Sequence, residues 1–307
     1  MKNTQSGQAL LTQSGQALLI VLLAMATIAT VALSIVSRSI TDVSVTTDEE
    51  DSLRAFSAAE AGIEEALTSD VFVGSDVVDK TLTSESGGGG DIIAQVNVDI
   101  AAFPQNSREY AYPIDLASGD YATVWLVSRD DEQIFACSAT NPCYTGNLLR
   151  LCWGKSGTSG STSVTPALET TMIYEDALGV NVRRQAYDPN SSRGNGYQSA
   201  TVGSCTVAGV TYAFFANLNL ASLGLPWSTP GGLKAIQVRM LYNTDQDHPF
   251  GIIGQGSSTD FPTQGRRVDS EGVAGASTRR IEAFLLHPEV PPYFNNAVFS
   301  NQSITKP

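Results

Sequence analysis

Residues that could carry out chemistry are few in this 307-residue chain. His248 and His287 are the only histidines; each precedes a proline, and neither has a second obvious metal ligand nearby. The sequence contains no G-x-S-x-G, H-E-x-x-H or phosphate-binding-loop motif. Serine-rich loops supply hydroxyl groups but no neighbouring base. We therefore expect no enzyme and no zinc site, and a catalytic set assembled only in space is the alternative.

Two loops carry oxygen ligands at alternating positions. Their residues are Asn243, Asp245 and Asp247 in one loop, and Asp188, Asn190 and Ser192 in the other. Calcium binds such ligands, but neither loop has the glycine and the distal glutamate of an EF-hand loop. Asx turns give the same spacing, so the sequence predicts no cofactor and leaves calcium as an alternative.

The chain has four cysteines, and an even number in an exported chain predicts disulfides. Three pairings are possible. We favour Cys137–Cys143, which closes a short loop around Asn141 and Pro142, together with Cys152–Cys205. Four buried thiols are the alternative.

Composition narrows the class of partner. The chain carries 18 Lys and Arg against 31 Asp and Glu, which gives a net charge of −13. An acidic chain without basic clusters is a poor candidate for binding nucleic acid. Gly, Ser, Thr and Asn are abundant and Lys is scarce, which suits a β-rich, extracytoplasmic protein.

The element that could hold this protein at a membrane lies near its N-terminus. Residues 17–36 contain no charged side chain. Twenty helical residues span about 30 Å, the thickness of the hydrocarbon core of a bilayer. The run is long for a secretory signal peptide, and no convincing A-x-A cleavage site follows it. We therefore expect a transmembrane helix that is retained in the mature protein.

The octapeptide TQSGQALL occurs twice, at residues 4–11 and at residues 12–19. Only the second copy leads directly into the apolar run, and its glycine is Gly15. A mature chain that began in the first copy would carry a polar, glycine-containing patch in its helix. We therefore interpret the first copy as part of a leader, and an extra turn of helix is the alternative.

A second helical pattern covers residues 47–68. Leu53, Phe56, Ile63 and Leu67 recur with helical spacing, and Glu60 falls within the same stripe. This part suits a protein surface rather than lipid. The β-branched residues between 41 and 47 favour a weak point, so the sequence leaves open one long helix or two.

The segment RAFSAAEAGIEEA, together with the glycine before a charge-free helix, resembles the type IV pilin-like proteins, most of all the PilX-type minor pilins. Residues Phe56, Ala58, Ala59, Glu60 and Ala61 match the F-x-A-A-E-A element of that family. The resemblance covers about the first 70 residues. It implies that prepilin peptidase cuts after Gly15 and leaves Gln16 as the N-terminus.

The chain departs from the pilin pattern at two positions. Ile20 stands where most pilins carry a glutamate, and Gln16 stands where most carry phenylalanine. The missing carboxylate argues against a major subunit and fits a minor, tip-located subunit or pseudopilin. The resemblance implies other pilin subunits, the inner-membrane assembly machinery and the lipid bilayer as partners. It also implies a single-pass protein of the cytoplasmic membrane that reaches the pilus and functions in assembly or adhesion.

The rest of the chain shows strand patterns separated by clusters of turn residues. The expected strands are residues 91–100, 121–129, 133–139, 147–154, 167–175, 180–187, 210–220 and 233–243, followed by a hairpin of 266–272 against 278–286. We expect an α+β protein with a leader (1–15), an N-terminal helix (16–69) and a large antiparallel, sandwich-like β domain (70–307). A signal-anchored binding domain that does not polymerise is the alternative.

Overall fold

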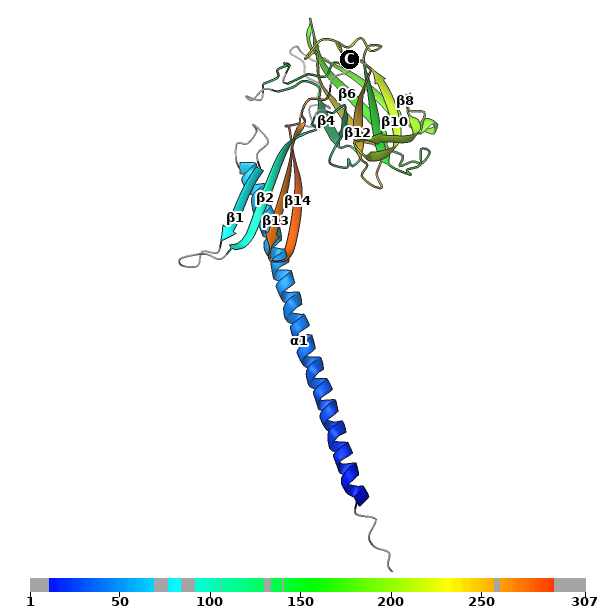
Figure 1. Cartoon of the computed structure of the whole chain (residues 1–307). Helices are drawn as coiled ribbons and strands as arrows, with labels where there is room; N and C mark the ends of the chain where they lie inside the picture. Colours follow the sequence, from blue (N-terminus) through cyan, green and yellow to red (C-terminus); the bar gives the residue numbers. More distant parts are fainter. Residues whose placement is uncertain are drawn as a thin grey trace, which may run out of the picture. The chain divides into compact units, whose positions relative to one another are not determined.

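The computed structural model describes residues 11–68, 77–83, 92–105, 107–129, 134–139, 141–256 and 260–289. The predicted leader therefore lies largely outside the described residues. Figure 1 shows the long N-terminal helix followed by a series of strands. The elements are α1 (Leu11–Thr68), β1 (Val77–Thr83), β2 (Ile92–Phe103), β3 (Glu109–Ala111), β4 (Tyr121–Trp125), β5 (Leu148–Lys155), β6 (Ala167–Asp176), β7 (Gly179–Asp188), η1 (Ser191–Arg193), β8 (Gln198–Ser199), β9 (Thr201–Val207), β10 (Val210–Asn219), β11 (Leu233–Leu241), β12 (Phe250–Gln255), β13 (Gly265–Ala274) and β14 (Ser277–Leu286).

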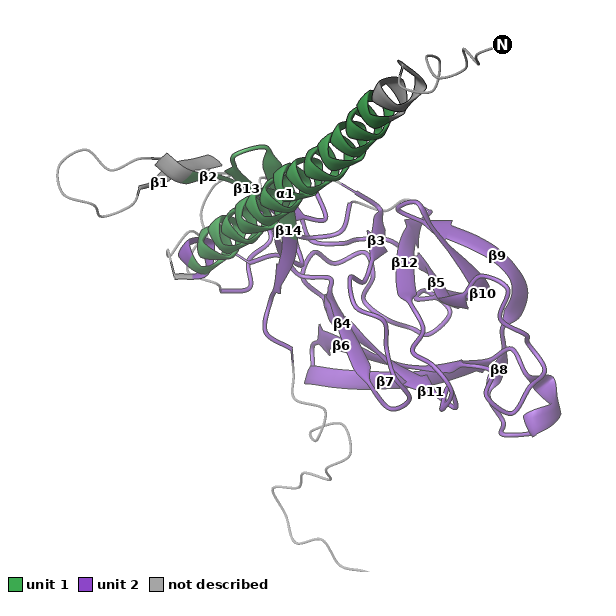
Figure 2. Ribbon diagram, turned by 90° about the horizontal axis from the view of Figure 1, so that it is seen from below, with its two compact units in different colours: residues 1–64, 78–97, 270–281 green, residues 65–77, 98–269, 282–307 purple. Residues whose placement is uncertain are grey.

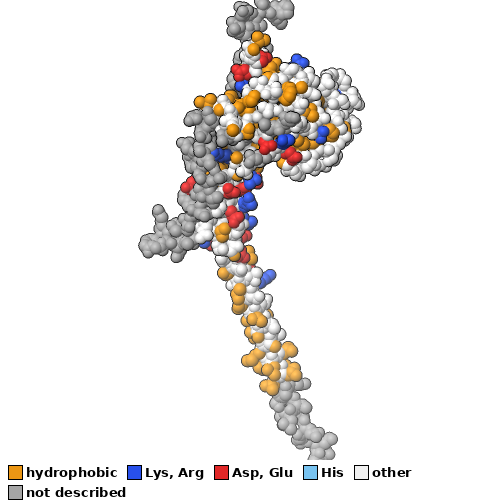
Figure 3. Space-filling model, turned by 45° about the horizontal axis from the view of Figure 1, so that its top comes forward, with side chains coloured by type: hydrophobic (Ala, Val, Ile, Leu, Met, Phe, Trp, Pro, Cys, Tyr) orange, Lys and Arg blue, Asp and Glu red, His pale blue; other side chains and the backbone are white. Residues whose placement is uncertain are grey.

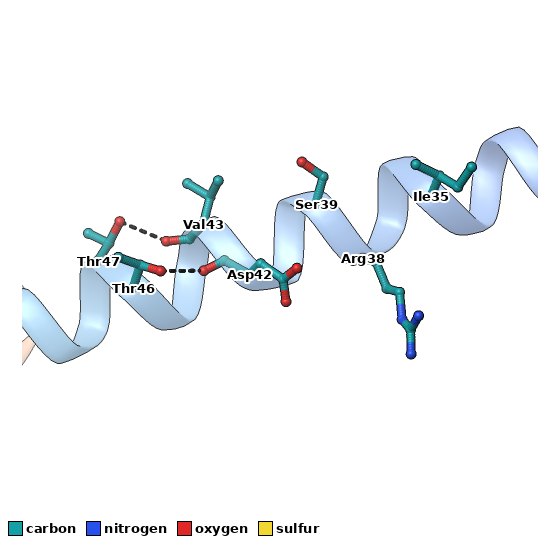
Figure 4. A pocket seen from close by; sticks show the side chains of 7 residues that line it. All are labelled: Ile35, Arg38, Ser39, Asp42, Val43, Thr46 and Thr47. Carbon is teal, nitrogen blue, oxygen red and sulfur yellow. Dashed lines mark hydrogen bonds between the residues drawn. The ribbon is translucent and has the colours of Figure 1, made fainter.

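Helix α1 is continuous through the β-branched stretch, which settles the choice between one helix and two. Thr46 Oγ1 donates to the carbonyl of Asp42 at 2.8 Å, and Thr47 Oγ1 donates to that of Val43 at 2.9 Å (Figure 4). Each hydroxyl group therefore shares a carbonyl of the preceding turn with the helix, and the helix continues in spite of this.

The chain divides into two compact units, coloured separately in Figure 2. Unit 1 comprises residues 1–64, 78–97 and 270–281, and therefore holds most of α1. Unit 2 comprises residues 65–77, 98–269 and 282–307. Strands β1, β2, β13 and β14 form one sheet in that order, and the expected hairpin at residues 266–286 is confirmed as β13 and β14.

Two further sheets build the core of unit 2. One has the order β3-β12-β5-β10-β9 and the other β4-β11-β6-β7-β8. Their pairings are antiparallel, except for two residues of β8 that run parallel to β7. Both sheets contribute side chains to one buried cluster, in which Trp153 and Phe214 of the first sheet join Met172 and Ile236 of the second. This is the antiparallel sandwich arrangement expected from the strand pattern.

One expected strand is wrong. Residues 134–139 contribute only an isolated bridge between Arg129 and Phe135. The disulfide Cys137–Cys143 brings two Cα atoms six residues apart to 5.4 Å. An extended segment of that length would span about 20 Å, so the crosslinked loop cannot continue as a strand.

The structure contains both favoured disulfides, Cys137–Cys143 and Cys152–Cys205. The second joins β5 to β9, which flank β10 within one sheet. It closes a sequence separation of 53 residues. Crosslinks over long loops restrict the unfolded chain most, so this bond is the larger contributor to the stability of unit 2.

Candidate functional site

The candidate site is helix α1, and its first half is an exposed apolar rod. The large apolar side chains from Leu18 to Val45, Ile20 among them, are solvent-exposed in this single chain. Figure 3 shows hydrophobic side chains along this part of the helix and charged ones further on. The helix is long and apolar enough to cross a membrane. It could therefore anchor the protein, with the disulfide-bearing β region outside the cytoplasm.

The second half of α1 buries a face of small residues within unit 1. Ala55, Ala58 and Ala59 are fully buried, and Gly62 lies on the same face. The spacing of i, i+3, i+4 and i+7 places these four residues in one stripe. Small side chains allow the helix backbone to approach its neighbour closely.

The neighbour of this stripe is β13, which meets it with the small residues Ser270 and Gly272. Ser270 is fully buried, and its Oγ donates to the carbonyl oxygen of Ala59 at 2.8 Å. A Cβ atom at Gly272 would overlap the carbonyl of Ala55 and lie 2.7 Å from the backbone nitrogen of Ala59. Glycine at 272 is therefore required by the close contact of two backbones.

A second stripe of α1, centred about 130° around the helix axis from the first, holds large side chains that are mostly exposed. Leu53 is 68% exposed, Phe56 is 44% exposed and Leu67 is 52% exposed. Glu60 is exposed in the same stripe, and Ile63 is partly buried. The sequence pattern drew attention to these large residues, whereas the structure buries the alanines and the glycine between them.

Polar contacts border the buried stripe. Arg279 of β14 donates to Ser52 Oγ from Nε at 3.0 Å and from Nη2 at 2.6 Å. A Cβ atom at Gly275, in the turn between β13 and β14, would overlap the carboxylate of Asp51. These contacts fix the rotation of the helix about its axis, so the large stripe keeps its outward direction.

The predicted cleavage position lies at the start of the described helix. Gly15 and Gln16 belong to the backbone of α1, and their side chains are outside the description. Residues 1–10, which include most of the first octapeptide, are outside it altogether. The described part of α1 starts at Leu11 and therefore includes the predicted processing point.

One of the two possible calcium loops has its carboxylate occupied. The Asp188 carboxylate accepts from Arg193 Nη1 at 2.8 Å and from Asn195 Nδ2 at 2.7 Å. Asn190 is buried, and its Oδ1 accepts from the backbone of Ser192. Asn190 therefore forms an Asx turn, and the positively charged side chain of Arg193 occupies the Asp188 carboxylate.

The second possible calcium loop also turns its amide inward. Asn243 Nδ2 donates to the carbonyl oxygens of Leu116 and Gln246, and Asp245 and Asp247 are exposed. Among the described residues, no group of three or more His, Cys, Asp or Glu is arranged to hold a metal ion.

Both histidines belong to unit 2, and burial lowers the pKa of both. His248 is fully buried, and its Nδ1 accepts from the backbone of Lys155 at 3.0 Å. Burial and the positive charges of Arg129 and Arg266 lower the pKa of His287 to about 4. Both imidazoles are therefore neutral at pH 7.

Comparison with protein-family models, with curated proteins and with solved structures finds no match to this chain.

Proposed function

We propose that this protein is a minor subunit of a type IV pilus or of a related pseudopilus, assembled through α1. The proposal rests on the different surroundings of the two halves of one helix. Its first half is apolar and exposed, and its second half binds a sheet through a small-residue stripe. The element that resembles the minor pilins contributes Phe56 and Glu60 to the large stripe, and Ala58 and Ala59 to the buried one.

The proposed mechanism is non-covalent. Before assembly, residues 17–36 lie in the lipid bilayer. Leaving lipid exposes about 30 Å of apolar helix, and the helices of neighbouring subunits restore that burial. The large stripe would extend the helix bundle beyond the membrane segment. Energy for extraction would come from a separate ATPase, since the sequence contains no nucleotide-binding motif.

The position of Glu60 in the exposed stripe supports a pairing role in this proposal. A carboxylate among Phe56, Ile63 and Leu67 becomes desolvated once another helix covers the stripe. A desolvated carboxylate is costly unless it is paired with a cation. We therefore expect a basic group of a neighbouring subunit opposite Glu60.

Intact mass of the protein recovered from membranes tests the proposal. We expect a chain that begins at Gln16 and a Gly15→Ala variant that stays unprocessed. A chain that begins at Gln8 would make the first octapeptide the working one. A chain that keeps Met1 would contradict processing by prepilin peptidase and favour a signal-anchored binding domain that does not polymerise.

A further inference from the structure

The two disulfides of unit 2 differ in their exposure to solvent. Cys152 and Cys205 are both buried, and they belong to one buried cluster. In the other disulfide, Cys143 is buried but Cys137 is exposed. Disulfides exchange by direct attack of a thiolate on a sulfur atom, so access to that sulfur limits the reaction. Only the Cys137–Cys143 disulfide offers an exposed half.

An open groove lies beside Cys137. Its lining includes Phe135, Val127 and residues 229–232, together with Cys137 itself. Gly231 faces the sulfur, because a Cβ atom built on Gly231 would lie 3.0 Å from Cys137 Sγ. The lack of a side chain at Gly231 therefore leaves room beside the sulfur for an attacking group.

The buried sulfur of the same disulfide has a hydrogen-bond donor. The backbone nitrogen of Ser128 donates to Cys143 Sγ at 3.3 Å. Such a donor stabilises the negative charge that develops on a sulfur as its disulfide bond breaks. The exposed half of the disulfide is therefore suited to be attacked, and the buried half is suited to leave.

Ser128 also holds both flanks of the crosslinked loop. Its carbonyl oxygen accepts from the backbone nitrogen of Ala136 at 3.0 Å, and its Oγ donates to the carbonyl oxygen of Pro142 at 2.6 Å. These two hydrogen bonds do not involve sulfur, so reduction does not remove them. They keep the two thiols close together, and the disulfide can form again.

The loop disulfide is also the one that unit 2 can lose at the lower cost. It closes a sequence separation of 6 residues, compared with 53 for Cys152–Cys205. A crosslink over a short loop restricts the unfolded chain less, so its loss lowers the stability less. Unit 2 can therefore stay folded while Cys137–Cys143 is reduced.

We propose that Cys137–Cys143 is a thiol–disulfide exchange site for a dithiol, and that Cys152–Cys205 does not exchange in the folded protein. One thiolate of the dithiol attacks Cys137 Sγ, and the electron pair of the broken bond goes to Cys143 Sγ, which takes up a proton. The second thiolate of the dithiol then attacks the dithiol sulfur of the mixed disulfide, and Cys137 leaves as a thiolate that is protonated in turn. The dithiol loses two electrons and two protons and becomes a disulfide, and the loop gains both as two thiols.

The proposal specifies a dithiol because Cys143 stays beside Cys137 after the first step. A mixed disulfide with a monothiol would be attacked by Cys143 and would revert. The inference is independent of the proposed function, because every residue of the site belongs to unit 2 and none belongs to α1.

Timed reduction of the full-length protein in detergent, without denaturant, tests the proposal. Dithiothreitol is the probe, and alkylation with iodoacetamide followed by peptide mass mapping reports each cysteine. We expect Cys137 and Cys143 to become alkylated at least about tenfold faster than Cys152 and Cys205. Equal rates for the two disulfides, or reduction of neither, would overturn the proposal. Glutathione at the same thiol concentration should reduce the loop disulfide less, and equal reduction would contradict the requirement for a dithiol.

Two single-cysteine variants of the loop identify the attacked sulfur. Cys143→Ser leaves Cys137 as a thiol, and Cys137→Ser leaves Cys143. We expect iodoacetamide to alkylate Cys137 in the first variant about tenfold faster than Cys143 in the second, because Cys137 is exposed. Equal rates or the reverse order would overturn the assignment of Cys137 as the attacked half.

A pair of glycine substitutions tests access through the groove. Gly231 has a φ of +75°, and asparagine tolerates this region better than most residues. Gly231→Asn therefore places a side chain beside Cys137 Sγ. Gly224→Asn is the matched control, because Gly224 has a φ of +71° and no described heavy atom beyond its chain neighbours lies within 4 Å of its added Cβ. We expect only Gly231→Asn to slow the reduction of Cys137–Cys143, and an unchanged or faster rate in that variant would overturn attack from the groove.

Discussion

The two faces of α1 between Asp51 and Leu67 differ in the size of their side chains and in what they contact. One face presents Ala55, Ala59 and other small residues, and it is buried against β13. The other presents Leu53 and Phe56, and it is exposed in the single chain. The residues that pack on the sheet here are therefore the smallest apolar ones of this part of the helix. Large apolar residues on a surface fit a contact made later, with another molecule.

Gly272→Ala should disturb the packing of the buried face of α1 more than any other substitution considered. The new Cβ atom would overlap the backbone of α1, and a backbone cannot move aside as a side chain does. We expect a loss of about 1–3 kcal/mol or more in the free energy of unfolding, measured by pulse proteolysis of the detergent-solubilised protein.

Gly203→Ala in β9 is the matched control for that substitution. The nearest heavy atom to its new Cβ would be Phe215 Cε1 at 3.8 Å, an ordinary contact. We expect little change in the free energy of unfolding. Equal effects of the two variants would mean that close packing of α1 on β13 does not stabilise unit 1.

The buried stripe was the part of the site that sequence reasoning missed. A search for helical periodicity gives weight to large residues such as Leu53 and Phe56, and alanine and glycine add little to that signal. The sequence signal for the buried stripe was the recurrence of small residues at i, i+3, i+4 and i+7. It becomes informative only once a close-packed partner such as Gly272 is known, and that partner lies more than 200 residues away.

The elements predicted correctly have strong local causes. The charge-free run of residues 17–36 predicts a helix by its length, and alternation in β5 predicts the burial of Leu149, Leu151 and Trp153 on one face. Strand β3 was missed because it has only three residues. Strand β12 was missed because two glycines in its six residues weaken its pattern.

Acidification should lower the stability of unit 2 through its histidines, which unit 1 lacks. Both histidines belong to unit 2, and the pKa of His287 is lowered to about 4. Below the ordinary value of 6.5, the unfolded chain binds a proton that the folded one does not, so stability falls as the pH drops toward 4. We expect a loss of about 1 kcal/mol in unit 2, allowing for the partial exposure of the imidazole.

Hydrogen exchange read separately for the two units would measure this pH effect. His287→Gln should flatten the decline between pH 6.5 and 4 in unit 2 and leave unit 1 unchanged. A decline of the same slope in the variant would assign the pH dependence to other groups.

Arg279→Ala should have a smaller effect, because it removes an exposed hydrogen-bonded contact with Ser52. We expect about 0.5 kcal/mol, measured by chemical denaturation. Arg183→Ala, on an exposed strand of unit 2, is the control for loss of an arginine. A loss of several kcal/mol on Arg279→Ala alone would mean that the polar border, rather than the alanine stripe, holds the helix on its sheet.

Leu53→Ala should change the free energy of unfolding least, because the side chain is 68% exposed in the single chain. We expect a change within about 0.5 kcal/mol.

If the exposed stripe is an assembly surface, the same substitution should nevertheless lower the amount of protein recovered in sheared filaments, because the lost methyl groups are buried only between subunits. Leu178→Ala, equally aliphatic and 93% exposed but far from α1 in sequence, is the matched control. Wild-type recovery of both variants would contradict a role for the large stripe in assembly. Loss of Leu53→Ala alone would show that stability and assembly use different faces of one helix.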